Sequence, residues 1–441
     1  MQITVYRTSK NTEERLTQIY KGEPNQQIST NSVKLDIDVK MQKIIGFGGA
    51  FTEAAAYTYS KLSTENQYKV IDAYFGQENG IGYELGRVAI TSCDFSFGNY
   101  TYADDKNKNL SNFSIKHDEK WLLPMMRDAK AALGRDILLF GAPWSPPAWM
   151  KDNNDMKYGG DLLPDYYDMW AEYFIKAIEE FKKEGFPMFA VSVQNEPDAV
   201  QTWESCIYSA EQERDFVKNY LGPVFEKSNI DAKIMIWDHN RDLIFERANE
   251  ILTDDDAYKY IWGTAFHWYV SEEFENVGKV HDKFPDKHLV FTEGCIEGGP
   301  RPGAWETGER YGRNIIGDLK NWNEAFIDWN LILDINGGPN HVGNFCDAPI
   351  LADIENDKLI FNSSYYYIAH FSKFIKPGAK RIDNTHINGI YTVAFENTNK
   401  SVVLVAQNEN DYDVDFSVHV RNKEHSVNCK AHSIMTMIFE D

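Results

Sequence analysis

Two glutamates in this sequence each follow an apolar segment that has the character of a β-strand. Glu196 stands in Gln194-Asn195-Glu196-Pro197 after residues 189–193, and Glu293 stands in Thr292-Glu293-Gly294 after residues 288–291. Hydrolysis of a glycosidic bond needs two carboxyl groups that face each other across the anomeric carbon. One protonates the leaving oxygen, and the other attacks or activates water. The pattern predicts glycosidase chemistry if the fold brings the two glutamates together.

Glu196 is the candidate acid/base. Its neighbour Asn195 can hydrogen-bond to a sugar hydroxyl, and Pro197 lacks a backbone donor and turns the chain away from the strand. An exposed loop glutamate is the alternative interpretation of Glu196, because most glutamates lie at the surface of proteins.

Glu293 is the candidate nucleophile, because Gly294 permits a substrate to approach the backbone closely. Its segment comes three predicted strands after that of Glu196, so the two side chains would face each other across a barrel mouth. A retaining pair of carboxyl groups stands about 5–5.5 Å apart, and an inverting pair about 6.5–9.5 Å. The charge on one carboxylate raises the pKa of the other, which keeps the acid protonated.

Aromatic residues gather after other strand-like segments. Trp144 follows residues 137–142, His267-Trp268-Tyr269 ends the sixth segment, and Trp329 belongs to the eighth. Indole rings with nearby amides suit the apolar faces and polar edges of sugars, whereas a single tryptophan is more simply explained as core. His267 taken alone is more often a structural histidine, and Arg87 is either a plain ion pair or a support for the carboxylates.

Eight strand-like segments alternate with amphipathic helical segments over most of the chain. This alternation predicts an α/β fold, a parallel and closed (β/α)8 TIM barrel with its chemistry at the carboxyl ends of the strands. Helices are predicted over residues 166–183, ending at Gly185, and over residues 210–221, with Ser209 as N-cap. The predicted barrel strands are residues 44–50, 85–90, 137–142, 189–194, 233–238, 263–268, 288–292 and 326–332.

Both ends of the chain show the period of two that is typical of β-strands. Residues 32–39 alternate before the barrel, and four short strands are predicted after it, at residues 389–396, 401–407, 414–420 and 433–439. We expect N-terminal strands at residues 1–40, a catalytic barrel at 41–376, and a C-terminal part at 377–441. The two terminal parts would together form an antiparallel side β-sandwich.

Composition narrows the range of partners. A net charge of −22 argues against nucleic acids and favours a neutral small molecule, expected to be a β-glycoside. No stretch approaches the roughly 18 uninterrupted apolar residues of a membrane span, and no secretory leader is visible, so we expect a soluble, cytoplasmic protein. A monomer and a homo-oligomer both stay open.

Cysteine and histidine patterns predict neither disulfides nor a metal site. The five cysteines form no CxxC pair and are expected as free thiols, with Cys295 as a core residue rather than a nucleophile. The eleven histidines are dispersed, without a His-x-His pair at the first strand or a His-Glu-x-x-His helix.

With these residues in place, the chain resembles glycoside hydrolase family thirty, in the branch of the acid β-glucosidases. The resemblance runs nearly from end to end and rests on motifs in a fixed order. These motifs are residues 46–52, 91–96, 100–104, 143–144, 195–197, 267–269, 328–331, 337–340 and 370–375.

The resemblance implies a retaining β-glycosidase that uses no metal or cofactor. An exo-acting β-glucosidase on small imported glucosides is the leading expectation. A β-xylosidase and a β-1,6-glucanase are alternatives within the family, and a carbohydrate-binding protein without turnover is an alternative from another class.

By the same resemblance, Glu196 is the acid/base and Glu293 the nucleophile. Glu53 stands where acid β-glucosidases carry an aspartate, and the resemblance implies that it contacts the distal hydroxyls of the sugar. The other residues expected around the sugar are Asn195 at the 2-hydroxyl, Trp144, Trp329 and Asn344 along the subsite, and Tyr269 near the nucleophile, with His267 and Arg87 completing the candidate set.

Overall fold

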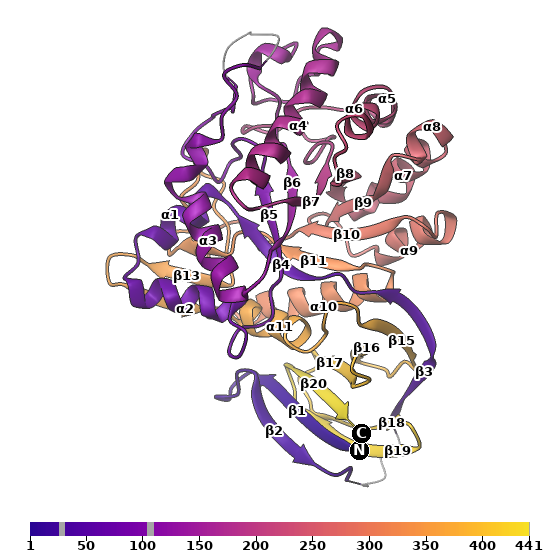
Figure 1. Cartoon of the computed structure of the whole chain (residues 1–441). Coiled ribbons are helices and arrows are strands. Elements are labelled where there is room, and N and C mark those ends of the chain that lie inside the picture. The colour runs from indigo at the N-terminus through magenta and orange to yellow at the C-terminus, as the bar shows by residue number, and fades with distance from the viewer. Residues whose placement is uncertain (26–30, 104–109, 441) are drawn as a thin grey trace.

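A closed barrel of eight parallel strands forms the larger part of the molecule (Figure 1). The computed structural model describes residues 1–25, 31–103 and 110–440; Asp104, at the end of the 100–104 motif, lies outside them. In their order around the barrel the strands are β4 (Gly46–Phe51), β5 (Leu85–Ala89), β6 (Leu138–Ala142), β7 (Met188–Ser192), β8 (Lys233–Asn240), β9 (Ile261–His267), β10 (His288–Glu293) and β11 (Ala325–Asp328).

The eight predicted barrel strands are confirmed, with one correction. The predicted eighth strand, residues 326–332, ends earlier, because Asn330 takes a φ of 20° and turns the chain after Asp328. Residues from Ile332 onward instead join a separate three-stranded sheet of β12 (Ile332–Asp334), β13 (Ile350–Asp353) and β14 (Lys358–Phe361). After this early turn Trp329 lines the cavity at the barrel mouth, and Asn330 accepts a hydrogen bond from Thr52.

Side chains rather than a pore fill the barrel. Seven of its strands contribute residues to one buried cluster, in the layered manner of such barrels. The buried members of this cluster are Leu85, Phe140, Ala190, Met235, Ala265, Val290, Ala325 and Ile327.

Helices surround the barrel on its outer side. The predicted helix at residues 166–183 is α4 (Tyr167–Lys183), and Ser209 caps α5 (Ala210–Phe216) as predicted, in a capping box with Gln212. After Phe216 the helix widens into a π turn, because Pro223 has no amide hydrogen for the carbonyl four residues earlier. The other helices are α1 (Glu53–Ser60), α2 (Thr64–Phe75), α3 (Leu122–Leu133), α6 (Gly222–Lys227), α7 (Ile244–Leu252), α8 (Asp255–Tyr258), α9 (Phe274–Lys283), α10 (Glu306–Lys320) and α11 (Ser363–Ser372).

The two ends of the chain build one nine-stranded sheet below the barrel, in the order β19-β18-β3-β15-β16-β17-β20-β1-β2. Neighbouring strands are antiparallel except β3 and β18, which run parallel. The sheet encloses its own hydrophobic core. Its strands are β1 (Gln2–Ser9), β2 (Thr17–Gly22), β3 (Ser32–Lys43), β15 (Lys380–Asn384), β16 (Ile390–Glu396), β17 (Val402–Asn408), β18 (Val414–Val420), β19 (Lys423–Cys429) and β20 (Ser433–Glu440).

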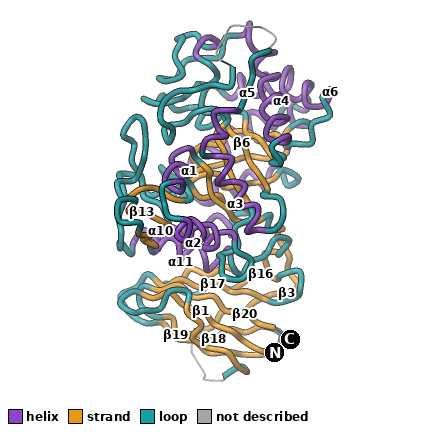
Figure 2. Tube along the Cα trace, turned by 60° about the vertical axis from the view of Figure 1, so that its left-hand side comes forward, coloured by secondary structure: helices purple, strands orange, loops and turns teal. Residues whose placement is uncertain are grey.

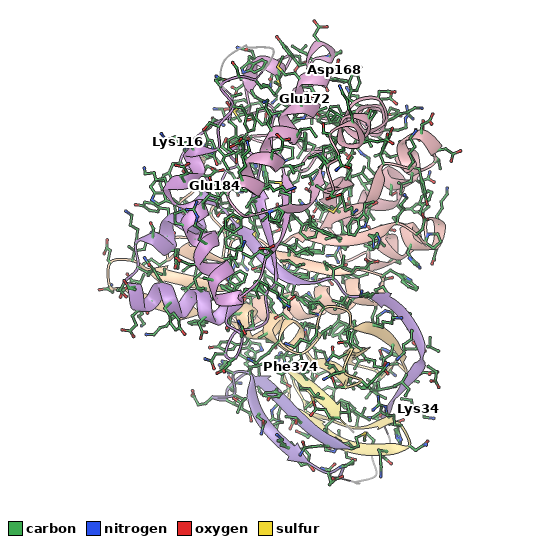
Figure 3. The ribbon with its side chains drawn as sticks, viewed as in Figure 1. Lys34, Lys116, Asp168, Glu172, Glu184 and Phe374 are labelled. Carbon is green, nitrogen blue, oxygen red and sulfur yellow. The ribbon has the colours of Figure 1, made fainter. Side chains whose placement is uncertain are left out.

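Helices α10 and α11 lie between the barrel and this β domain (Figure 2). Strand β20 alternates accordingly: Met435 and Met437 face the core of the β domain, whereas Thr436 bonds to His370 on α11. Phe374, just after α11, stacks on Tyr6 of β1 with ring centroids 4.6 Å apart, and Figure 3 labels it at this junction. The β domain is therefore packed against the barrel through buried side chains.

Within the described residues, no helix is both long enough and apolar enough to cross a membrane.

Candidate functional site

A cavity of about 300 Å³ opens at the carboxyl ends of the barrel strands. Seven of the residues expected around the sugar line it: Trp144, Asn195, Glu196, Tyr269, Glu293, Trp329 and Asn344. They come from the end of β10 and from loops that follow five other strands, so the fold brings together residues that lie far apart in the chain.

Glu196 projects from a strained turn just after β7. Its φ is 51°, a left-handed conformation that costs a non-glycine residue roughly 1–3 kcal/mol. Two hydrogen bonds hold the turn in place: the Glu196 amide donates to the carbonyl of Asp238 at 3.0 Å, and the Asn195 amide donates to that of Pro143 at 2.9 Å. The neighbouring strands β6 and β8 therefore fix the direction of the Glu196 side chain.

Glu293 ends β10, and both of its carboxylate oxygens have partners. Oε2 accepts a hydrogen bond from Arg87 Nη1 at 2.5 Å, and Oε1 accepts one from the Tyr269 hydroxyl at 2.8 Å. One oxygen of Glu293 lies within 4.8 Å of an oxygen of Glu196. The two candidate carboxylates thus face each other at the short separation typical of retaining glycosidases.

Arg87 lies beneath the cavity and is 1% exposed. Besides its bond to Glu293, its Nη2 donates to Asn195 Oδ1 at 2.7 Å and to Asp238 Oδ2 at 3.0 Å. Of the two interpretations that the sequence left open for Arg87, the geometry fits a support for the carboxylates, because the guanidinium fixes Glu293 and Asn195 together.

Asp238 is a central residue of the site that the sequence analysis did not single out. A register shift in β8 and the left-handed Trp237 and Asp238 form a bulge that turns the Asp238 carboxylate inward. Fully buried, it accepts hydrogen bonds from Arg87, His267, Ser192 and Thr292. The signal was visible in the sequence, since Asp238 is a carboxylate at the end of the fifth predicted barrel strand.

His267 links Asp238 to Glu196. Its Nε2 lies 3.1 Å from Asp238 Oδ1, and its Nδ1 lies 3.2 Å from Glu196 Oε1. Burial opposes the charged imidazolium, but Glu293, Asp238 and Glu196 outweigh it and raise the pKa of His267 to about 9. The sequence left His267 between a structural residue and a member of the candidate set; it does not line the cavity, but it places a positive charge beside Glu196.

The charge of His267 acts on Glu196. Burial raises the pKa of the Glu196 carboxyl, but the hydrogen bond from His267 and the charges of His239 and His267 exceed this effect and lower it below its usual value. Asp238 also has a pKa held below its usual range, because burial is outweighed by Arg87 and His267. These groups leave Glu293 and Glu196 in a site with two buried cations.

Two tryptophans form one wall of the cavity. The rings of Trp144 and Trp329 stack with centroids 5.3 Å apart and planes 19° apart. The Arg87 guanidinium packs 4.7 Å from the Trp144 ring centroid, which holds the wall and the ion pair in a fixed relation. Such a wall suits the apolar face of a sugar ring.

Asn344 reaches the cavity together with Asp94, an acidic residue that the sequence analysis quoted within a motif but did not propose for the site. Asp94 Oδ2 accepts hydrogen bonds from Asn344 at 2.9 Å and from Asn340 at 3.1 Å. Burial raises the pKa of Asp94 to about 7 despite these bonds. Asp94 and Asn344 together offer an acceptor and amide groups to sugar hydroxyls.

Glu53, which was expected to contact the sugar, does not line the cavity. Its carboxylate accepts the Phe97 amide at 3.0 Å and pairs with His117 at 2.7 Å. Glu53 is the first residue of α1, and its side chain holds the loop at residues 95–97 by accepting a hydrogen bond from the Phe97 amide. Among the described residues, Asp94 is the acidic side chain that takes the expected place beside Asn344.

Cys295 also lines the cavity, although it is 2% exposed. Its Sγ lies 3.7 Å from the Tyr269 hydroxyl. A hydrogen bond with the thiol of Cys346, together with burial, raises the pKa of Cys295 well above its usual value, which favours the protonated thiol over the thiolate that a nucleophile needs. All five cysteines are free and buried, as expected.

Glu196, His267 and Glu293 offer one potential metal-ligand atom each within 4.8 Å of one another. Their surroundings do not suit a cation, because Arg87 already places a positive charge 2.5 Å from Glu293 and His267 is itself protonated. A divalent ion would meet two fixed positive charges at this place.

Comparison with known proteins agrees with the barrel and the β domain described above. Residues 44–375 match the TIM-barrel domain of glycosyl hydrolase family 30, and residues 378–437 match the β-sandwich domain of that family. The chain is 36% identical to mouse lysosomal acid glucosylceramidase over 87% of this chain and 78% of that one.

Two solved structures have the same fold over the full chain. SrfJ from Salmonella typhimurium superposes with a TM-score of 0.96 at 34% identity, with 100% of both chains covered. The endo-β1,6-glucanase BT3312 superposes with a TM-score of 0.90 at 30% identity, with 100% of this chain and 99% of that one covered. From its barrel, its β-sandwich and these relatives, the chain is a glycoside hydrolase that belongs to family 30.

Proposed function

We propose that this chain is an exo-acting β-glucosidase in which Glu196 is the acid/base and Glu293 the nucleophile. The retaining mechanism is general to the family. The observation that carries the assignment of the pair is the contact within 4.8 Å between oxygens of the two carboxylates at the barrel mouth. This spacing leaves no room for a water molecule between nucleophile and sugar, as an inverting enzyme would need.

In the first step, protonated Glu196 donates its proton to the glycosidic oxygen. At the same time a carboxylate oxygen of Glu293 forms a bond to the anomeric carbon, the glycosidic bond breaks, and the protonated aglycone leaves. Arg87 and Tyr269 hold Glu293 in line and balance its charge. In the second step, Glu196 accepts a proton from water as the water attacks the anomeric carbon and the bond to Glu293 breaks. Two displacements at the same carbon retain its configuration.

Electrostatics act differently on Glu196 in the two steps. In the free site the hydrogen bond from His267 and the charges of His239 and His267 lower the pKa of Glu196 despite its burial, whereas the negative charge of Glu293 opposes them. In the glycosyl-enzyme that negative charge is lost, so His267, 3.2 Å from Glu196, favours the carboxylate without opposition. The site therefore stabilises the carboxylate form that the second displacement requires of Glu196 as a base.

The size and lining of the cavity support a terminal glucosyl unit. At about 300 Å³ it is at the small end of ligand cavities, which suits one sugar ring and the start of an aglycone. Trp144 and Trp329 can cover the apolar face of the ring, and Asn195, Asn344 and Asp94 can bond to its hydroxyls.

A β-1,6-glucanase is the second candidate, because BT3312 is named as an endo-β1,6-glucanase and matches the whole chain at 30% identity. A β-xylosidase is the third. A protein that binds sugars without hydrolysis is the alternative from another class, and the presence of both carboxylates argues against it.

We also propose that the enzyme acts inside the cell on neutral β-glucosides. The five free, buried cysteines support a reducing compartment, where disulfides are rare. The competing proposal is a role in sphingolipid metabolism outside the cytoplasm, by analogy with the lysosomal acid glucosylceramidase of the mouse.

A panel of substrates tests these proposals. It contains 4-nitrophenyl β-glucoside and β-xyloside, a β-1,6-linked gluco-oligosaccharide and glucosylceramide. We expect the highest kcat/KM on the β-glucoside, with β-glucose as the first product by NMR. Cleavage within the oligosaccharide at a higher kcat/KM would favour the glucanase, and binding without any product would favour the non-catalytic alternative.

A further inference from the structure

The loop between β12 and β13 carries Asn344 to the cavity, and its own side chains order it. Asn340 Oδ1 accepts the amides of Val342 at 3.1 Å and Asn344 at 3.0 Å, while its Nδ2 donates to Asp94 Oδ2 at 3.1 Å. The amide of His341 donates to the carbonyl of Asp94 at 3.1 Å. The position of Asn344 therefore depends on this loop remaining attached to Asp94.

A second loop, after β7, carries Trp203 to the cavity, and the next residue joins the two loops. Glu204 is 1% exposed, and its Oε2 pairs with His341 Nε2 at 3.1 Å. Its Oε1 is buried and has no hydrogen-bond partner in the described part of the chain. His341 thus supplies the side-chain contact that compensates a deeply buried carboxylate.

The charges around this pair are predominantly negative. His341 faces Glu204 and Asp94, and Asp94 in turn faces Glu204 and Glu293. The charge of Lys151 also interacts with Glu204, but the Lys151 ammonium donates its hydrogen bond to the carbonyl of Ser205, at 2.6 Å, rather than to Glu204. Without a charge on His341, Glu204 and Asp94 would be two buried carboxylates with little compensation.

We propose that His341 and Glu204 form a charged latch that positions the Trp203 and Asn344 loops for sugar binding and keeps Asp94 available to the sugar. This inference rests on the proposed glycosidase function and adds two positioning residues to it. The latch is built from side chains outside the pair of catalytic carboxylates and acts on the affinity for the sugar rather than on the chemical step.

The charges of His341 and Glu204 determine how pH acts on the latch. When His341 loses its proton, the Glu204 carboxylate is left buried and unpaired, which costs several kcal/mol unless it protonates or the loops separate. Because a rising pH disfavours protonation of Glu204, the loops separate, and this removes Asn344 and Asp94 from their arrangement around the cavity. The bond to Glu204 raises the pKa of His341, so the latch is closed below that pKa and opens as the pH rises through it.

A set of three variants tests the latch: His341→Gln, Glu204→Gln and the double variant. The substrate is whichever nitrophenyl glycoside of the panel the wild type hydrolyses. We expect His341→Gln to raise KM about tenfold with kcat within about twofold, because the carboxylate pair is untouched. Adding Glu204→Gln should recover most of the lost affinity, because the neutral pair leaves no unpaired buried charge.

The pH dependence gives a second readout. The KM of the wild type should rise on the alkaline side as His341 deprotonates, and the double variant should lack this rise. His288→Gln is the matched control, since His288 pairs with Glu324 at 2.6 Å at the opposite end of β10, and its KM should equal that of the wild type.

Two results would overturn the latch: a KM for His341→Gln within twofold of the wild type, or a double variant no better than the single one. If His341→Gln does not fold by circular dichroism, the alkaline KM profiles of the wild type and the double variant decide instead. Failure of the proposed β-glucosidase activity would show separately, as a wild type that does not hydrolyse the glucoside.

Discussion

His267 bridges Asp238 and Glu196, with its two ring nitrogens 3.1 Å and 3.2 Å from the respective carboxylates. Because the pKa of His267 is raised to about 9, both nitrogens carry protons at neutral pH and donate. Asp238 also binds Arg87, which holds Glu293. One buried aspartate therefore organises the partners of both proposed catalytic residues.

Replacing His267 by Gln should move the pH profile of kcat/KM. The positive charge of His267 lowers the pKa of Glu196, so its removal raises that pKa, and the alkaline limb should shift upward by about one pH unit. The measurement is kcat/KM against pH for phenyl β-glucoside, whose poor leaving group needs the proton. An unchanged alkaline limb would show that another group sets it.

The two proposed catalytic glutamates should respond differently to substitution. Glu293→Gln should abolish turnover of every glycoside, because no covalent intermediate can form. Glu196→Ala should lose about 10²–10⁴ in kcat/KM on phenyl β-glucoside but far less on 2,4-dinitrophenyl β-glucoside, which needs no proton. Azide should restore turnover of Glu196→Ala and give β-glucosyl azide by NMR. Wild-type rates in either variant would contradict the assignment.

Asp238→Asn should reduce both activity and stability. It leaves Arg87 and His267 without their shared counter-charge, and breaking such a buried arrangement costs about 3–5 kcal/mol of unfolding free energy. We expect kcat to fall by about 10². Asp318→Asn is the matched control, because Asp318 forms a buried pair with Arg241 at 3.2 Å away from the cavity. Urea unfolding should show destabilisation of both variants, with kcat lost only in Asp238→Asn; equal losses of kcat would refute a specific role.

Acid should destabilise the junction of the two domains through His370. This buried histidine bonds to Thr8 and Thr436, and burial lowers its pKa to about 3. In the unfolded chain His370 binds a proton below about pH 6.5, whereas in the folded chain it stays neutral down to about pH 3. The free energy of unfolding therefore falls as the pH falls from 6.5 towards 3. The loss between pH 7 and pH 5 should be about 2 kcal/mol.

His370→Asn keeps an amide for the two threonines and removes the titration. Urea unfolding of the wild type and the variant at pH 7 and pH 5 measures the difference. A wild type that loses no more stability than the variant over this interval would contradict the assignment.

Gly48→Ala should disrupt the barrel. A Cβ at this position would lie 2.1 Å from the carbonyl oxygen of Leu85 on the adjacent strand, and backbone atoms cannot move aside. We expect a loss of about 3 kcal/mol, measured by thermal or urea unfolding. Gly278→Ala in α9 is the control. It meets only the movable Asn321 side chain at 3.0 Å and should be neutral or slightly stabilising, because alanine favours the helix.

Much of the barrel could be predicted from the sequence because its strands are buried on both faces. Such strands read as apolar runs, and helices with a period of 3.6 separate them. The strands β15 and β19 were not predicted, because Lys380-Arg381-Ile382-Asp383-Asn384 and residues 423–429 carry mostly polar side chains. Their pairing partners, rather than their own composition, make them strands.

The sequence indicates those residues of the site that lie at strand ends or within recognisable motifs. Glu196, Glu293, Arg87 and the tryptophans converge because the carboxyl ends of parallel strands meet. Asp238 was missed although it ends a predicted strand, because only the bulge in β8 turns its carboxylate inward. Glu53 does not line the cavity, because it begins α1 and its carboxylate pairs with His117, which a sequence motif alone cannot show.

The pairing of β1 with β20 joins Ile3 to Phe439, and β3 takes both of its partners from the last part of the chain. During synthesis on the ribosome, β3 therefore emerges long before β15 and β18 exist. The barrel can close while β3 still has two unpaired edges. A nascent chain halted after β11 would thus carry all eight barrel strands together with an unpaired β3, and unpaired strand edges promote aggregation.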